Sequence, residues 1–369
     1  MKPAWLRSSQ GCNKASGNRA RFDGERLPLA LLQPWLDRNQ AGFMPFGELS
    51  LQGEFARTGG AWGGRATVRS GVGGLRIDPR SPREIAAYRD LALDAELRGG
   101  EANLSLSAAL AQEGHLRGRL RTGLASDSAL SGELDLDMRD ISWLELFSID
   151  LASPTGRLSG QLQFGGRRDA PVLSGEARLA NFAGELPALG VTMKQGEFVL
   201  RGAADGQTRL TGQVMSGEGR LNVDGSLDLS RRDSPLRLKL RGENITIADT
   251  PDLEAVVGSD LDLSYEKDIL TLRGSVTVPR ARVELERLDS SVDPSPDVVV
   301  LDPRRTPSLD RFQVDSDLDI RLGNDVRLRG FGLDGRLGGS LRLRDRPGHS
   351  ATANGTLTVR GKYAAYGQS

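Results

Sequence analysis

The sequence predicts an all-β protein: an elongated, curled antiparallel sheet with an apolar interior and few short helices. Three observations lead to this fold class. A phrase of the form Leu-x-Gly-x-Leu-x-Leu recurs along the chain, its apolar residues alternate with polar ones, and turn residues separate the runs. The 369 residues include 46 glycines but only 5% aromatics. A β-sandwich of this length usually carries aromatic core anchors, so a repeating one-sided sheet fits this composition better.

The recurring phrase carries the strand signal. Alternation with a period of two places one set of side chains on an apolar face and the other on a wet face. Turn pairs such as Gly165-Gly166 and Ser216-Gly217 punctuate the runs at a spacing that suits antiparallel strands with short loops. Copies with apolar variants stand at 51–55, 116–120, 130–136, 158–164, 173–179, 210–214, 223–229, 272–278, 337–343 and 353–359.

The leucine face defines the candidate site, because an apolar trough can hold an apolar ligand. We expect its lining to come from the leucines and other aliphatic residues of the repeats. The candidate residues are Leu104, Leu106, Leu134, Leu136, Leu162, Leu227, Leu229, Leu238, Leu240, Leu272, Val276, Leu318, Ile320, Leu341, Leu343 and Leu357.

The glycine of the phrase has the same parity as the leucines, so it lies on the apolar face, where a packed core would place a side chain. Two explanations are open. Glycine can let each strand bend, which curls the sheet over its own apolar face. The missing side chains can also leave a channel for an apolar ligand. The two are compatible, and bending is the preferred reason at any one position.

Regions that break the pattern divide the chain. Residues 1–21 form a polar leader without assignment, residues 22–287 form the repeating groove, and residues 288–312 form a proline-rich loop. Two short helices are predicted, one over Pro28 to Leu36 and one starting at Ser81-Pro82-Arg83-Glu84.

Composition argues against several classes of site. The 49 basic and 49 acidic residues give no net charge, which disfavours a nucleic-acid surface. Two histidines and one cysteine leave little material for a zinc site, a disulfide or a histidine base. We therefore expect no enzyme, no cofactor, no metal, and no catalytic or cofactor-binding residue.

Two short motifs imitate known sites. The aspartates of Asp315-x-Asp317-x-Asp319 resemble the start of a calcium loop, but Ile320 and Val326 stand where glycine and glutamate are required. Alternating carboxylates on the wet face of a strand explain them better. The pair Ser264-x-x-Lys267 lacks the companion motifs of a serine acyl-enzyme.

No run of 18 apolar residues and no secretion signal is present in the sequence. Taken alone, this pattern indicates a cytoplasmic protein. The alternative is an internal fragment that has lost its targeting segment.

The C-terminal motifs resemble a known family. They are Val314-Asp315-Ser316-Asp317-Leu318, then Leu322-Gly323-Asn324-Asp325-Val326, then Gly332 to Leu341 (GLDGRLGGSL), then Gly355 to Gln368 (GTLTVRGKYAAYGQ). In this order they are similar to the TamB-like translocation and assembly module subunits of the AsmA-like superfamily. On this resemblance residues 313–369 are the start of the family's C-terminal conserved region, truncated, and the chain is an internal to C-terminal-proximal fragment.

The resemblance implies a taco-like β-groove in the periplasm of a Gram-negative envelope, in a full-length protein anchored in the inner membrane. It implies transport of phospholipid acyl chains between the two membranes, and an outer-membrane barrel of the TamA/Omp85 type as partner. A scaffold for outer-membrane protein or autotransporter assembly stays open as the alternative. An extracellular β-solenoid enzyme or adhesin ranks third, because clustered carboxylates and aromatic sugar platforms are missing.

Overall fold

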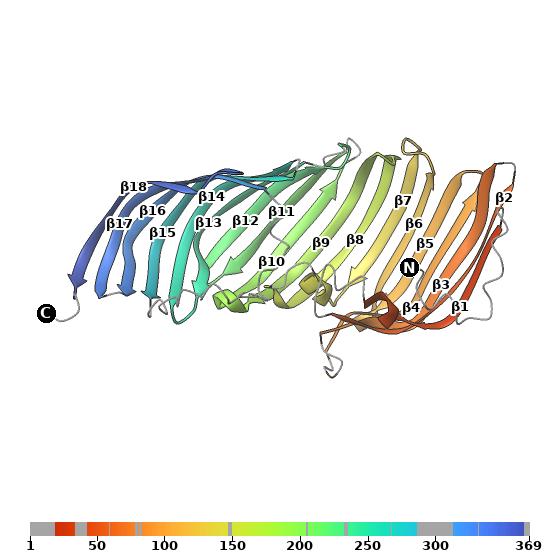
Figure 1. Cartoon of the computed structure of the whole chain (residues 1–369), viewed down its shortest axis with the longest axis horizontal. Coiled ribbons are helices and arrows are strands. Elements are labelled where there is room, and N and C mark those ends of the chain that lie inside the picture. Colours follow the sequence, from red (N-terminus) through yellow and green to blue (C-terminus); the bar gives the residue numbers. More distant parts are fainter. Residues whose placement is uncertain are drawn as a thin grey trace, which may run out of the picture. The chain divides into compact units, whose positions relative to one another are not determined.

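The computed structural model consists of strands and short 3-10 turns, and its strands are assigned to one open sheet (Figure 1). It describes residues 19–33, 43–58, 60–77, 80, 83–146, 150–203, 206–231, 235–266, 268–285, 313–330 and 332–364. The predicted all-β, curled sheet class is confirmed. The loop predicted at 288–312 and residues 1–18 of the leader lie outside the described residues, whereas β1 begins at Arg19.

The chain folds as two compact units, which are described separately. Unit 1 comprises residues 1–183, 197–208 and 228–232, and unit 2 comprises residues 184–196, 209–227 and 233–369. The strands β9 (Ala170–Leu186), β10 (Val191–Gly202) and β11 (Gln207–Ser216) contribute residues to both units, and the 3-10 turn η5 (Pro187–Leu189) belongs to unit 2.

In unit 1 the strands β1 to β8 pair antiparallel in chain order, each with the next, as a meander (Figure 1). This is the arrangement that alternating runs with short turns predict. The strands are β1 (Arg19–Pro28), β2 (Met44–Thr58), β3 (Ala61–Arg76), β4 (Glu84–Arg98), β5 (Glu101–Leu110), β6 (Gly114–Gly123), β7 (Leu130–Met138) and β8 (Ala152–Arg167). Its 3-10 turns are η2 (Leu29–Leu32), η3 (Ala111–Glu113) and η4 (Ser142–Leu146).

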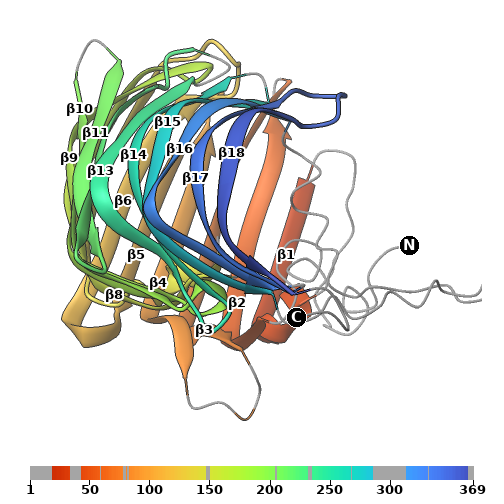
Figure 2. The same cartoon turned by 90° about the vertical axis from the view of Figure 1, so that its left-hand side faces the viewer.

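In unit 2 the strands from β12 to β18 also pair in chain order, and β13 to β18 bend along their length (Figure 2). Their bounds are β12 (Gly219–Asp228), β13 (Leu236–Asp249), β14 (Leu253–Glu266), β15 (Ile269–Leu285), β16 (Gln313–Gly330), β17 (Leu333–Asp345) and β18 (Thr352–Tyr363).

One pair of unit 2 departs from the predicted antiparallel pattern. Strands β15 and β16 are parallel, with Ile269 beside Gln313 and Leu285 beside Gly330. A tight turn cannot join parallel neighbours, which need a connection of a dozen or more residues. The proline-rich stretch between the two strands is long enough to allow this direction, although the alternating pattern gave no sign of it.

The two predicted helices have different outcomes. Leu29–Leu32 forms a 3-10 turn, and the end of that prediction lies outside the described residues. The helix expected to start at Ser81 is wrong, because Glu84 begins β4. The residues that follow it, from Ile85 to Leu97, pair with β3, and the cross-strand pairing there overrides the local capping signal.

Glycines of the apolar face bring neighbouring strands close together. A Cβ built on Gly160 would lie 2.7 Å from the Cα of Ala177 and 2.7 Å from the carbonyl oxygen of Glu176. Gly274 and Gly339 have φ of +132° and +120°, a region that side chains disfavour. At these positions glycine is required by the backbone conformation or by the close approach of a neighbouring strand. This supports the explanation in which glycine allows the strands to bend. At Gly118 the nearest atom to such a Cβ is a methyl of Leu134 at 3.4 Å, so there the added atom has room.

Gly160 and Gly118 therefore form a matched pair for a stability test. Gly160→Ala forces β8 away from Glu176 and Ala177, and we expect it to lower the free energy of unfolding by about 1–3 kcal/mol. Gly118→Ala adds an ordinary contact and should change it by less than about 1 kcal/mol in either direction. Urea unfolding followed by circular dichroism measures both. Equal losses in the two variants would contradict a requirement for close approach at Gly160.

Candidate functional site

The apolar face of unit 1 is built by strand register. Leu134 in β7 lies directly opposite Gly118 in β6 and Leu162 in β8, and Gly118 in turn lies opposite Leu106 in β5. Directly opposed residues share a face of the sheet, and so do residues two apart on one strand. The structure therefore brings together all five unit 1 candidates that precede β9 on one face: Leu104, Leu106, Leu134, Leu136 and Leu162.

Exposure distinguishes the two faces of unit 1. Leu136 and Leu162 are each 8% exposed. On the opposite face the side chains of Arg119 and Glu133 are 80% and 62% exposed. Leu162 packs with Leu173, Ala177, Leu134, Phe164, Leu200 and Leu229 in one cluster. The sheet thus shields part of its leucine face, whereas Leu104 on the same face is 37% exposed.

Open hollows lie beside these leucines. One of about 830 Å³ is lined by Leu104, Leu120 and Phe164 together with charged residues such as Arg119. A second of about 510 Å³ is lined by Leu106, Leu134 and Leu162 with their polar strand neighbours. Both volumes fall in the range of ligand sites.

Unit 2 repeats the same construction. Leu238 lies opposite Leu263, which lies opposite Leu272, and Ile320 lies between Val276 and Leu341. The register places all the unit 2 candidates on this apolar face: Leu227, Leu238, Leu240, Leu272, Val276, Leu318, Ile320, Leu341, Leu343 and Leu357. Leu357, in β18, is 42% exposed.

Leu229 is the exception among the candidates. It lies in the turn that follows β12, not in a strand, and packs against the Leu162 cluster of unit 1. The repeated phrase placed it two residues after Leu227, whereas the strand ends at Asp228. Leu229 is apolar because it packs in this cluster. The repeated phrase does not distinguish such a turn residue from a strand residue.

Sequence reasoning missed the core cluster of unit 2. In unit 2 the core cluster is Ala248, Ala255, Ala281 and Val326, with Val278, Leu322 and Leu337 packed against it. These residues lie on the apolar face and come from the five strands β13 to β17, and only part of them belongs to the repeated phrase. The signal that could have found them is the continued alternation of apolar residues beyond each copy of the phrase.

A rim contact of unit 1 was also missed. The turn η4 returns to the start of β4, where the Ser142 hydroxyl accepts a hydrogen bond of 3.3 Å from the Ala86 amide. Glu145, with a side chain only 7% exposed, pairs with the Arg83 guanidinium and accepts a hydrogen bond of 2.9 Å from the Ser153 amide. The Arg83–Glu145 pair joins residues 62 positions apart, a distance over which no local pattern is informative.

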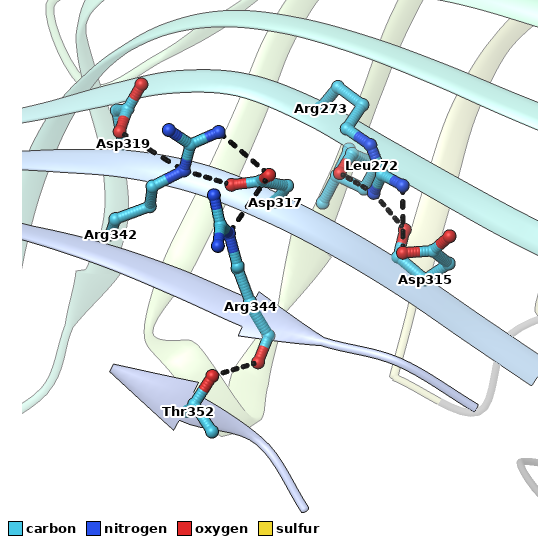
Figure 3. Close-up of polar contacts among 8 residues, drawn as sticks. All are labelled: Leu272, Arg273, Asp315, Asp317, Asp319, Arg342, Arg344 and Thr352. Atoms are coloured by element: carbon cyan, nitrogen blue, oxygen red, sulfur yellow. Dashed lines mark hydrogen bonds and ion pairs between the residues drawn. The ribbon is translucent and has the colours of Figure 1, made fainter. Parts of the chain in front are cut away.

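The wet face of unit 2 carries ion pairs between strands (Figure 3). The Arg342 Nε donates to an Asp317 oxygen at 2.6 Å, and the Arg344 Nε donates to the other oxygen at 3.3 Å. The Arg273 guanidinium lies 2.8 Å from Asp315. The hydrogen bond from Arg342, with the charges of Arg342 and Arg344, lowers the pKa of Asp317 to about 2. These carboxylates stand on the wet face, as interpreted from the sequence.

The two short motifs supply no assembled site. Ser264 lies in β14 opposite Arg237 and Thr271, and Lys267 lies outside the described residues. Across the part of the chain that the structure describes, no cluster of three or more histidine, cysteine or acidic side chains could hold a metal ion. No helix in that part is both long and apolar enough to cross a membrane.

Comparisons with known proteins match nearly the whole chain. The family model described as the TamB C-terminal domain matches residues 207–369, and the model of the TamB N-terminal domain matches residues 9–179. The Haemophilus influenzae protein named translocation and assembly module subunit TamB is 24% identical over 294 residues, which cover 75% of this chain. The matched region is 22% of that relative's length. No solved structure matches the chain.

The carboxyl of Asp317 provides a test of the wet face. Its lowered pKa means that the ion pair stabilises the fold above the ordinary pKa of 3.8 and that this contribution is lost as the pH falls through about 2. Arg342→Gln removes the main cause, so the pKa should rise towards 3.8. Carbon NMR titration of the carboxyl measures it.

The control is Asp137 of unit 1, whose pKa is lowered by its own partner Arg157. It should titrate unchanged in the Arg342→Gln protein. If the pKa of Asp317 also stays near 2 in that protein, Arg342 is not its partner.

Proposed function

Because the chain belongs to the TamB family, we propose that it carries phospholipid acyl chains along its apolar face between the two membranes of a Gram-negative envelope. The proposal concerns the activity of a whole protein, because the relative that this chain matches is longer than the chain. Membership of the family supports a role in the translocation and assembly module. The more specific part of the proposal is that acyl chains occupy the apolar face.

One observation carries the proposal: within each unit the apolar rows continue from strand to strand. In unit 1 the row from Leu106 through Gly118 and Leu134 to Leu162 crosses four strands without a charged member. In unit 2 the row from Val276 through Ile320 to Leu341 does the same across three. A chain of methylene groups can lie along such rows in continuous apolar contact.

The energetics favour an acyl occupant. Each CH₂ group moved from water to an apolar surface gains about 0.8 kcal/mol, so a long chain on this face is stabilised strongly relative to water. The gain is spread evenly along the rows, which allows sliding because no single position holds the chain. The headgroup can stay in water at the edge of the face. Neither step requires a catalytic group, and we propose that the protein is not an enzyme and uses no cofactor.

The proposed location and partners follow from the family. They are the periplasm, in a protein held in the inner membrane, and an outer-membrane barrel of the TamA/Omp85 type at the receiving side. Phospholipid is the proposed cargo.

A second function, a scaffold for the assembly of outer-membrane proteins, is favoured by β18. This strand pairs with β17, and every one of its residues is exposed. An exposed strand can template another strand through its backbone groups. In that case the partner would contact β18, and charged groups on the apolar face would be tolerated.

Site-specific photo-crosslinking separates the two functions. A photoreactive residue at Leu134 or Leu341 should form adducts with lipid, because both positions lie on the apolar rows. The matched positions Glu133 and Ser340 are the strand neighbours of these leucines and face the other way, so lipid adducts there should stay at background. Mass spectrometry of the adducts gives the readout in cells expressing the protein.

The opposite outcome is equally clear. Protein adducts at β18 with no lipid adduct at Leu134 or Leu341 would reject the transport proposal and support the scaffold. A charged variant, Leu134→Lys, adds a second measurement: it should reduce co-purifying lipid if the face conducts acyl chains, whereas a scaffold would tolerate it.

A further inference from the structure

Four arginines form a row across unit 2. Arg282 in β15 lies directly opposite Arg327 in β16, Arg327 lies opposite Arg336 in β17, and Arg336 lies opposite Arg360 in β18. The row stands on the wet face, immediately behind the core residues Ala281 and Val326, which point the other way. Neighbouring strands are about 4.8 Å apart, so the row is on the order of 14 Å long.

This row departs from the charge pattern of the neighbouring wet face. In the middle of these strands opposed charges alternate in sign: Lys239 lies opposite Asp262, which lies opposite Arg273, which lies opposite Asp317. Like charges directly opposite each other on neighbouring strands destabilise a sheet. One other like-charge pair, Asp249 opposite Glu254, lies at the end of the β13–β14 hairpin. Only here do three such pairs follow one another across neighbouring strands of unit 2, which indicates that an external anion completes the row.

The carboxylates nearby leave part of the row uncompensated. Arg282 pairs with Glu254 at 2.6 Å and Arg327 pairs with Asp325 at 3.1 Å. In the described part of the chain, no carboxylate pairs with Arg336 or Arg360. Both side chains are exposed, so two guanidinium groups at the centre and end of the row are available to a ligand.

The row lies near one rim of the sheet. Each of its arginines stands three residues from the end or the start of its strand, with Leu285, Gly330, Leu333 and Tyr363 at the rim itself. Tyr363 is 70% exposed, and Val359, on the apolar face, is 50% exposed. Tyr363 lies opposite Leu333 and therefore also on the apolar face, so this rim presents arginines on one face and exposed tyrosine and valine on the other. Basic residues and an exposed tyrosine at one rim are typical of surfaces that meet the boundary between lipid headgroups and acyl chains.

We propose that the arginine row binds the phosphate groups of anionic lipid headgroups at this rim. A guanidinium presents its donors in a fork that matches phosphate oxygens, and long arginine side chains can reach past the strand end towards the rim. An acidic protein segment would also carry negative charge, but it would give no role to the exposed Tyr363 and Val359. The choice of a lipid over a protein rests on the proposed function, and it adds a preference for anionic headgroups.

The test uses the full chain and vesicles of phosphatidylcholine with or without 30 mol% phosphatidylglycerol, a composition on the order of natural anionic surfaces. Arg336→Gln with Arg360→Gln should weaken binding to the anionic vesicles by about 30-fold, since each basic residue near such a surface contributes roughly fivefold. Vesicles without phosphatidylglycerol should bind weakly and equally to both proteins. Co-sedimentation measures the binding.

The control is Arg237→Gln with Arg321→Gln, which removes the same charge from the same face. Arg237 lies between Ser226 and Ser264, and Arg321 lies between Thr277 and Ser340, so both have neutral neighbours on adjacent strands. They are also more than a Debye length of about 8 Å from the row along the strands. This variant should retain most of the binding. The urea midpoint of the Arg336/Arg360 variant should stay the same or rise, because a like-charge contact is removed.

Several results would overturn the inference. They are equal loss in the two double variants, equal binding to vesicles without phosphatidylglycerol, and displacement of the protein by inorganic phosphate alone, which would mark a free-phosphate site. Stronger competition by polyglutamate than by anionic vesicles would indicate an acidic protein partner instead.

Co-purifying lipid, measured on the same variants, separates this inference from the proposed function. If lipid co-purifies but the arginine substitutions do not change vesicle binding, the row does not bind headgroups, and the transport proposal is still supported. If the arginines control vesicle binding while lipid never co-purifies, the membrane contact stands without transport.

Discussion

Cross-strand register is the constraint on which the rest of the structure depends. The sheet is a single layer, and the described part of the chain contains no α-helix that could cover its leucine face. Each leucine therefore has to find its apolar neighbours on the adjacent strands, as Leu134 does between Gly118 and Leu162. A slip of one residue would turn the whole leucine set of a strand to water, so register is strongly specified.

The same register organises the wet face. Opposed pairs such as Lys239 and Asp262 alternate in sign where the strands have no other role. Exposed pairs of this kind contribute little each, about 0–1 kcal/mol, so their main effect is to disfavour wrong pairings in which like charges meet. Against this background the row that contains Arg336 and Arg360 is informative because it departs from the arrangement. Our two proposals use different faces: the apolar face for the acyl chain and the wet face for the headgroup.

Alternation of residues was enough to predict the fold class and the face on which Leu134, Leu162 and Leu341 lie, because both depend on local parity. Their role in lipid contact stays a prediction. Parity does not predict the relative direction of two neighbouring strands or contacts between residues far apart in the sequence. The parallel pairing of β15 and β16 depends on a long connection, and the contact of Arg83 with Glu145 joins segments far apart in the chain. The helix expected at Ser81 failed for the related reason that pairing with β3 overrides a capping signal.

The hairpin meander also bears on how such a protein can change its length during evolution. Removing β6 and β7 together would leave β5 and β8 antiparallel, with Leu106 and Leu162 still on one face, because an even number of strands preserves direction. Each such deletion or duplication would alter the groove by about 10 Å, in steps of two strand spacings. Losing one strand would make its neighbours parallel, as β15 and β16 are, and would then require a long connection in place of a tight turn. The fold is thus permissive to insertions of whole hairpins and intolerant of single-residue frameshifts within a strand.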